Sequence, residues 1–142
     1  MSRSNPEAEH QLSLTKRPRR LRRNPSIRNL VSETQLTVDD LIYPMFVTEG
    51  ENQRVEITSM PDCYRYSLDL LLKEIAEIYS LGIKAVALFP VVAEAKKDDH
   101  GTESYNPEGL AQLTVSAIKA QTPGMLVITD VALDPFTTHG HD

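Results

Sequence analysis

The sequence lacks several features that define large classes of protein. It has a single cysteine in 142 residues, which excludes an internal disulfide and a zinc module built from several cysteines. It has no long hydrophobic run: the longest, residues 85–93, has nine residues and contains Pro90, whereas a membrane-spanning helix needs about 20. The length suits one domain. We therefore expect a single domain in a reducing, cytoplasmic compartment, with no membrane partner.

Acidic residues are scarce in the first 30 residues, and basic residues are scarce in the rest of the chain. Residues 1–30 hold eight basic and two acidic side chains, a net charge of +6, and the remaining seven basic and 18 acidic residues give −11. We expect residues 1–33 to form a basic N-terminal arm and residues 34–142 to form an acidic body. No apolar segment follows the basic residues as in a secretory signal, and Glu7 and Glu9 disfavour a transit peptide.

The composition of the arm leaves two kinds of partner open. Its arginine-rich segment, residues 17–25, could neutralise nucleic-acid phosphates in a salt-sensitive way. Against this, the arm has no aromatic residue to stack on a base, and the acidic body would repel phosphate. The alternative is a tail that docks on an acidic protein surface. We expect the second, and no nucleic-acid partner.

The hydrophobic pattern of the body predicts alternating strands and helices. Apolar runs at residues 41–47, 85–90 and 125–129 have the length of buried strands, and their lack of a polar face is typical of parallel sheets covered by helices. Residues 48–66 are expected to form a long polar connection. The sequence therefore predicts a βαβαβ order with long polar loops after the strands.

Two amphipathic helices are expected between these strands. The first has Ser67 as its N-cap and Gly82 just after its end. The second has Asn106 as its N-cap and Pro107 at its first helical position. Its apolar stripe is predicted to be Leu110, Leu113, Ala117 and Ile118, before residues 122–124 end it.

The loop after the third strand, residues 129–142, holds the strongest candidates for chemistry. It contains three carboxylates and two histidines, and active sites in this fold class lie at the carboxyl ends of strands. Strand alternation would place Asp130, Ala132 and Asp134 on one face. Such an oxygen-rich loop suits Mg²⁺ better than zinc, although His-x-His with aspartate could bind zinc. The alternative is a solvated loop in which Asp134 caps the turn at Pro135.

Six motifs, in order along the chain, carry a resemblance to a known family. The sequence resembles the porphobilinogen synthase family, also called 5-aminolaevulinate dehydratase, from about residue 16 onward. The motifs are RPRRLRR (17–23), LIYPMFV (41–47), SMP (59–61), ALFP (87–90), YNPEGL (105–110) and TDVALDPF (129–136).

This resemblance implies a (β/α)₈ TIM barrel preceded by an extended N-terminal arm that embraces a neighbour in a homo-octamer. The family is a lyase that condenses two molecules of 5-aminolaevulinate into porphobilinogen with loss of two waters, an early step of haem and chlorophyll biosynthesis. Its two Schiff-base lysines lie on late barrel strands. A full barrel needs about 250 residues, so we expect residues 34–142 to be the first three β/α units, and this N-terminal fragment to be inactive alone.

The resemblance also assigns roles within the loop. Asp130 matches the family's active-site aspartate, which orients the substrate amine. Three cysteines of zinc-dependent members correspond to Ala132, Asp134 and Asp142, so the loop resembles the aspartate-rich, magnesium-responsive, allosteric type of some bacteria and plastids. This predicts Mg²⁺ at Asp134 and Asp142, or only at an allosteric site elsewhere, with zinc less favoured. The location would be cytoplasmic, or the plastid stroma in a plant or alga.

Two other functions remain open from the residues themselves. One is a small α/β module that binds nucleic acid or a protein partner through the basic arm. The other is an open α/β domain that binds a phosphorylated ligand, which is weakened because no glycine-rich loop follows a strand.

Overall fold

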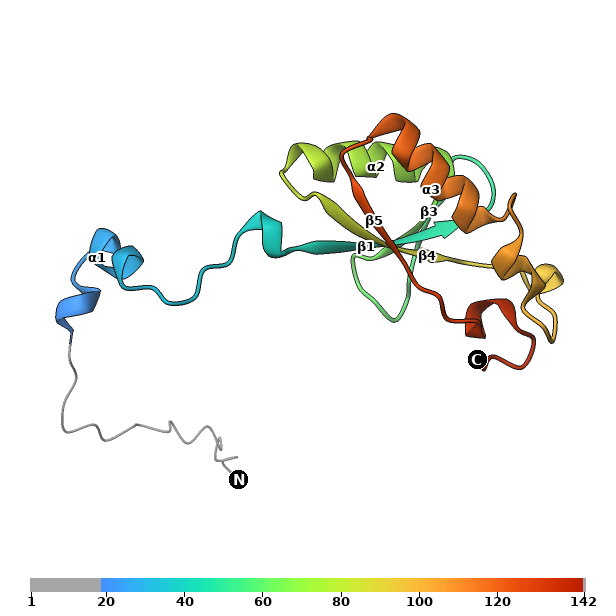
Figure 1. The fold of residues 1–142 in the computed structure, drawn as a ribbon, viewed down its shortest axis with the longest axis horizontal. Helices are drawn as coiled ribbons and strands as arrows, with labels where there is room; N and C mark the ends of the chain where they lie inside the picture. Colours follow the sequence, from blue (N-terminus) through green and yellow to red (C-terminus); the bar gives the residue numbers. More distant parts are fainter. Residues whose placement is uncertain (1–18, 142) are drawn as a thin grey trace, which may run out of the picture. The chain divides into compact units, whose positions relative to one another are not determined.

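A computed structural model describes residues 19–141 of the chain (Figure 1). The chain divides into two units between Gln35 and Leu36. The division between arm and body that the sequence suggests, after residue 33, stays a prediction. Asp142 lies outside the described residues.

The described part of the first unit contains two short helical segments. A 3₁₀ turn spans Arg20–Arg22, and helix α1 spans Pro25–Leu30. Helix α1 begins here because Asn24 Oδ1 accepts a hydrogen bond from Ile27 N at 2.9 Å and Pro25 occupies the first helical position. None of residues 19–35 is buried, and Leu30 is 85% exposed. This segment therefore has no core of its own.

The second unit is built on one five-stranded sheet with the order β2-β3-β1-β4-β5. Strands β3, β1, β4 and β5 run parallel, and β2 pairs antiparallel with β3 at one edge. The strands are β1 (Ile42–Thr48), β2 (Arg54–Glu56), β3 (Tyr64–Ser67), β4 (Ala85–Pro90) and β5 (Leu126–Thr129), and the helices are α2 (Leu68–Ser80) and α3 (Leu110–Gln121). The predicted alternation of strands and helices along β1-α2-β4-α3-β5 is confirmed.

Both long helices cover the same face of the sheet (Figure 1). Alternate residues of β1 and β4 point to this face, where they pack against the apolar sides of α2 and α3. The buried cluster consists of Met45, Val47, Tyr66, Leu71, Ile75, Ile78, Val86, Leu88, Ile118 and Met125. The hydrophobic core therefore lies between the sheet and the two helices.

The polar connection expected at residues 48–66 is wrong, because it contains β2 and β3. Strand β3 pairs with the last residues of β1, with Phe46 opposite Arg65. Strand β2 pairs antiparallel with β3, with Val55 opposite Arg65, and the Arg54 guanidinium lies 3.7 Å from the centroid of the Tyr64 ring. Strands of three and four residues with polar side chains carry too little hydrophobic periodicity to be recognised.

The predicted ends of α2 are confirmed, although Ser67 acts differently from a simple cap. Its hydroxyl accepts from Gln53 N at 2.9 Å and donates to Asp69 Oδ1 at 2.6 Å, and it makes no capping bond to the helix backbone. Gly82 follows the helix with φ of +103°, a conformation that favours glycine.

The predicted start of α3 is wrong by one turn. Helix α3 begins at Leu110 with Gly109 as its N-cap. Asn106 instead closes a tight turn, in which its side chain accepts from Glu108 N at 3.0 Å and its carbonyl accepts from Gly109 N at 2.9 Å. The predicted stripe also shifts, because Thr114 is fully buried while Leu113 is 49% exposed.

Strand β5 is at the edge of the sheet and is not the buried strand that its composition predicts. Leu126 and Ile128 are 59% and 39% exposed. They lie on the face opposite the helices, together with Ile42 of β1, which is also exposed. In the described part of the chain, no helix is long and apolar enough to cross a membrane.

Candidate functional site

A cavity of about 680 Å³ lies where β4 and β5 end, against the first half of α3. This is the edge of a parallel sheet at which the carboxyl ends of the strands meet, and ligand sites in α/β folds gather there. The residues that line the cavity come from β4, the turn before α3, α3 itself, and the loop after β5. They are Leu88, Pro90, Ser104, Tyr105, Ala111, Gln112, Val115, Ser116, Thr129, Asp130, Val131, Ala132, Leu133 and Phe136.

Asp130 is the acidic residue of this cavity wall. It follows directly after β5, its side chain is exposed, and its Oδ1 accepts a hydrogen bond from Ala132 N at 3.2 Å. This short-range bond turns the chain away from the strand direction. The carboxylate therefore stands at the end of a parallel strand with its charge available to a cationic group.

The strand alternation expected to place Asp130, Ala132 and Asp134 on one face does not hold. Strand β5 ends at Thr129, and a 3₁₀ helix spans Asp134–Phe136. The hydrogen bond from Ala132 N to Asp130 Oδ1 bends the chain just after Thr129, so the extended conformation that alternation requires does not continue. Asp130 and Ala132 line the cavity, and Asp134 does not.

The predicted metal ligands are only partly visible in the structure. Asp134 is exposed at the start of the 3₁₀ helix, and Asp142 lies beyond the described range. Among residues 19–141, no group of three or more His, Cys, Asp or Glu side chains is placed to hold a metal ion. The donors in this loop are carboxylate oxygens and imidazole nitrogens, with no thiolate, so its chemistry suits a hard cation but Asp134 alone makes no site.

The two histidines of the loop lie side by side. The rings of His139 and His141 stack with their centroids 6.1 Å apart, and both are exposed. The Thr137 hydroxyl donates to the His141 carbonyl at 3.0 Å, which closes a turn around Gly140. Gly140 has φ of +68°, so a glycine suits this turn.

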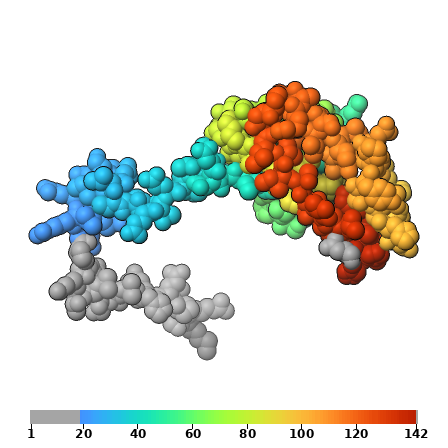
Figure 2. Space-filling model, viewed as in Figure 1, coloured from blue at the N-terminus to red at the C-terminus, as the bar shows by residue number. Residues whose placement is uncertain are grey.

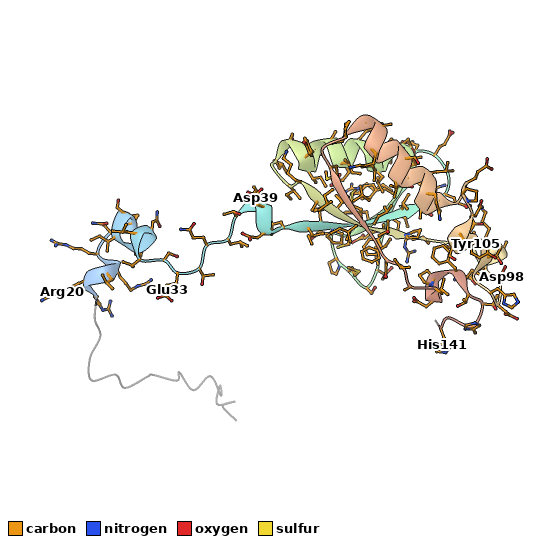
Figure 3. All side chains as sticks on the ribbon, in the orientation of Figure 1. Arg20, Glu33, Asp39, Asp98, Tyr105 and His141 are labelled. Atoms are coloured by element: carbon orange, nitrogen blue, oxygen red, sulfur yellow. The ribbon has the colours of Figure 1, made fainter. Side chains whose placement is uncertain are left out.

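The other long loop at this end follows β4 and carries a small ionic network. Lys96 Nζ lies 2.6 Å from Glu49 Oε1 in the loop after β1, and 3.7 Å from Glu103 Oε1. The hydrogen bond and charge of Glu49 raise the pKa of Lys96. The loops after β1 and β4 are therefore joined. Figure 3 labels Asp98, Tyr105 and His141, which belong to the same end of the second unit.

Sequence reasoning missed the contributions of Ser104, Tyr105 and Gln112 to the cavity. These residues come from the 3₁₀ turn Thr102–Tyr105 and from α3, and Gln112 Nε2 donates to the Ser104 carbonyl at 2.8 Å. Their approach to the loop after β5 depends on tertiary packing, for which the sequence offers no local signal.

Comparisons with known proteins agree with one another. A family model described as "Delta-aminolevulinic acid dehydratase" matches residues 15–142. The chain is 47% identical over 131 residues to the delta-aminolevulinic acid dehydratase of Chlamydia pneumoniae and 51% identical over 126 residues to that of Halalkalibacterium halodurans, covering 92% and 89% of this chain. A solved Toxoplasma gondii delta-aminolevulinic acid dehydratase, in complex with its reaction product porphobilinogen, is 46% identical, with a TM-score of 0.84 over 92% of this chain.

These relatives are longer than the chain. It spans 40% and 38% of the two bacterial relatives and 37% of the solved Toxoplasma gondii chain.

Proposed function

Because the chain belongs to the delta-aminolevulinic acid dehydratase family, we propose that the complete protein condenses two molecules of 5-aminolaevulinate into porphobilinogen with loss of two waters. It would act as a lyase of tetrapyrrole biosynthesis. The observation that carries the proposal is the family match across residues 15–142, which includes the cavity and Asp130 at the end of β5.

We assign Asp130 the role of orienting the substrate amine. An exposed carboxylate directly after a parallel strand can pair with an ammonium group. The strand end holds the backbone at this position. The carboxylate can therefore be presented in a fixed place.

The lysines of the described residues support the view that this chain alone is inactive. Lys84 and Lys119 lie at the opposite end of the sheet, where Lys84 Nζ donates to the Tyr79 carbonyl at 3.0 Å and Lys119 Nζ donates to the Met125 carbonyl at 2.8 Å. Lys96 and Lys97 are ion-paired. None of these four lines the cavity, and neither does Lys73 of α2, the fifth lysine among residues 19–141. Imine chemistry on the substrates needs an amine close to them, so the Schiff-base lysines would come from outside this chain.

We propose that residues 34–142 form the first three β/α units of a TIM barrel. The support is the parallel run β1-β4-β5 with both helices on one face, and the apolar residues Ile42, Leu126 and Ile128 exposed on the other. Phe46 and Phe89 stack on that second face with centroids 5.4 Å apart. In a closed barrel this face would line the interior, where such side chains are buried.

The metal and the assembly are also proposals. The carboxylates Asp134 and Asp142, in a loop without cysteine, favour Mg²⁺ over zinc.

Leu21 and Leu30 are exposed in the first unit beside several arginines, which suits an arm that packs on an acidic neighbour in a homo-octamer. Sedimentation of the complete protein without residues 1–28 would test the arm, since an intact octamer would leave nucleic acid as the partner to examine.

The function is tested by incubating the complete protein with 5-aminolaevulinate and measuring porphobilinogen colorimetrically. We expect activity that chelation abolishes and that Mg²⁺ restores better than zinc. A complete protein that makes no porphobilinogen with either metal would refute the proposed function. Restoration by zinc alone would refute only the choice of metal.

A further inference from the structure

The loops after β4 and β5 are tied together at one point. Asp98 N donates to the Phe136 carbonyl at 3.3 Å, and the Asp98 carbonyl accepts from Thr138 N at 3.1 Å, so Asp98 and Thr137 form a one-residue parallel bridge. The Thr138 hydroxyl also donates to the Asp99 carboxylate. Figure 2 shows the two loops in contact on the surface of the second unit, in yellow-orange and dark red. We call the contacts of Asp98, Asp99, Gly101 and residues 136–138 the loop junction.

The side chain of Asp98 shapes its own half of the loop junction. Its Oδ1 accepts hydrogen bonds from His100 N at 2.9 Å and from Thr102 N at 3.0 Å. These bonds fold residues 98–102 into a tight turn, in which Gly101 has φ of +61°. Without this carboxylate, two backbone N–H groups would lose their protein acceptor.

The turn is packed closely against the loop after β5. A Cβ atom at Gly101 would lie 3.6 Å from Phe136 Cβ and 3.6 Å from Thr137 Cγ2, so the turn lies within van der Waals reach of these side chains. Phe136 and Thr137 are 8% and 5% exposed, although most of their loop is exposed. Phe136 and Thr137 are therefore the buried residues of the range 130–141, whereas Thr138 of the loop junction is exposed.

The loop junction limits how far Asp130 can move. Strand β5 fixes the chain up to Thr129, and the loop junction fixes it again from Phe136, so the segment that carries Asp130 and Asp134 is held at both ends. A short segment with two fixed ends has few conformations. Its geometry then depends on the shape of the turn that Asp98 maintains.

We propose that Asp98 is a positioning residue, which fixes the loop that presents Asp130 to the substrate through its turn and the bridge to residues 136–138. This inference rests on the proposed function for its consequence in catalysis. The structural part of the inference, that Asp98 fixes the loop after β5, does not depend on that function. Asp98 itself lies outside the residues that line the cavity.

The test compares three variants of the complete protein. Asp98→Ala removes the acceptor for both N–H groups, whereas Asp98→Asn keeps an Oδ1 acceptor in the same place. Asp69→Ala is the matched control, because Asp69 also accepts from a hydroxyl and a backbone N–H, at the start of α2 and away from the loop junction. Kinetics with 5-aminolaevulinate and hydrogen exchange at Phe136 and Thr138 are measured for each.

We expect Asp98→Ala to lower kcat/KM by at least about tenfold, because small misplacements of catalytic groups have effects of this size or larger. Asp98→Asn should stay within about twofold of the parent, and so should Asp69→Ala even if it lowers the unfolding temperature as much. The Thr138 amide should exchange faster in Asp98→Ala only. Equal losses in Asp98→Ala and Asp69→Ala, or no rescue by Asp98→Asn, would overturn the proposal.

Failure of the proposed function can be told apart from failure of this inference. If the parent protein makes no porphobilinogen, the function is refuted, and the exchange experiment still decides the loop junction. Unchanged exchange at Phe136 and Thr138 in Asp98→Ala would show that Asp98 does not hold the loop, whatever the protein catalyses.

Discussion

The two ends of the parallel strands in the second unit are built for different tasks. Where β4 and β5 begin, the chain returns from each helix within a few residues, and lysine side chains bond to nearby carbonyls. Where these strands finish, the loops are long and polar, and they enclose the cavity with Asp130. We call these the starting end and the finishing end. From this difference we expect changes at the starting end to alter stability and changes at the finishing end to alter activity.

The largest effect should come from Asp130 at the finishing end. Asp130→Ala in the complete protein is expected to lower kcat/KM by about 10²- to 10³-fold, because the charged group that we propose to contact the substrate is lost. Unfolding should be unchanged, since the side chain is exposed. Asp39→Ala, just before β1 at the starting end, is the control and should leave the kinetics intact. Equal values of kcat/KM for the two variants would show that Asp130 does not contact the substrate.

The next effect concerns the core near the starting end. Ile78 is 3% exposed in the last turns of α2, and Ile78→Ala should lower the free energy of unfolding by about 2–5 kcal/mol through lost packing and a cavity. Leu81→Ala, three residues on and largely exposed, should change it by no more than about 0.5 kcal/mol. Urea denaturation measures both. Similar values would mean that α2 is not packed on the sheet as described.

A smaller loss of stability is expected from a change at the turn between α2 and β4. Gly82 has φ of +103°, and a Cβ there would lie 3.2 Å from Val38 Cγ2. Gly82→Ala should therefore lower the free energy of unfolding by about 1–3 kcal/mol through backbone strain. The KM for 5-aminolaevulinate, measured at a temperature where the variant stays folded, should be unchanged. A raised KM would contradict the separation of the two ends.

The smallest effect is the dependence of stability on pH. Hydrogen bonds from Thr102, first from its side chain and then from its backbone, lower the pKa of Asp98, and the Ser67 hydroxyl chiefly lowers that of Asp69. A lowered pKa means that the folded state holds its proton less tightly than the unfolded state. The stability from these groups is present above about pH 4 and is lost as pH falls through their folded pKa values.

Unfolding temperatures measured between pH 3 and pH 6 would check this. The parent should lose stability below about pH 4, and Asp98→Asn should show a shallower loss, because amides do not titrate in this range. An identical pH profile for the parent and for Asp98→Asn would contradict the role given to this carboxylate.

The parts of the fold that the sequence predicted are those with strong periodicity. Helix α2 and strands β1 and β4 have clear apolar patterns and end signals such as Gly82. Strands β2 and β3 were missed because they are short and polar, and because they depend on pairing, of β3 with β1 and of β2 with β3. Helix α1 was also missed, although Asn24-Pro25 is a start signal for a helix.

The candidate site was predictable in its location and less so in its shape. The composition of residues 129–142 marked the loop after β5, and the cavity with Asp130 lies there. The alternation that grouped Asp130 with Asp134 failed because β5 ends at Thr129. The loop junction joins residues about 40 positions apart through backbone bonds. Such bonds do not depend on residue type, so no local pattern reveals them.

We propose that substrate binds at the finishing end, against Asp130. A crystal structure of the complete protein with porphobilinogen tests it most directly. We predict the Asp130 carboxylate within hydrogen-bond distance of the aminomethyl nitrogen of the product, with residues 136–138 still bridged to Asp98. Porphobilinogen bound at the starting end, or with Asp130 turned away from it, would rule out this binding site.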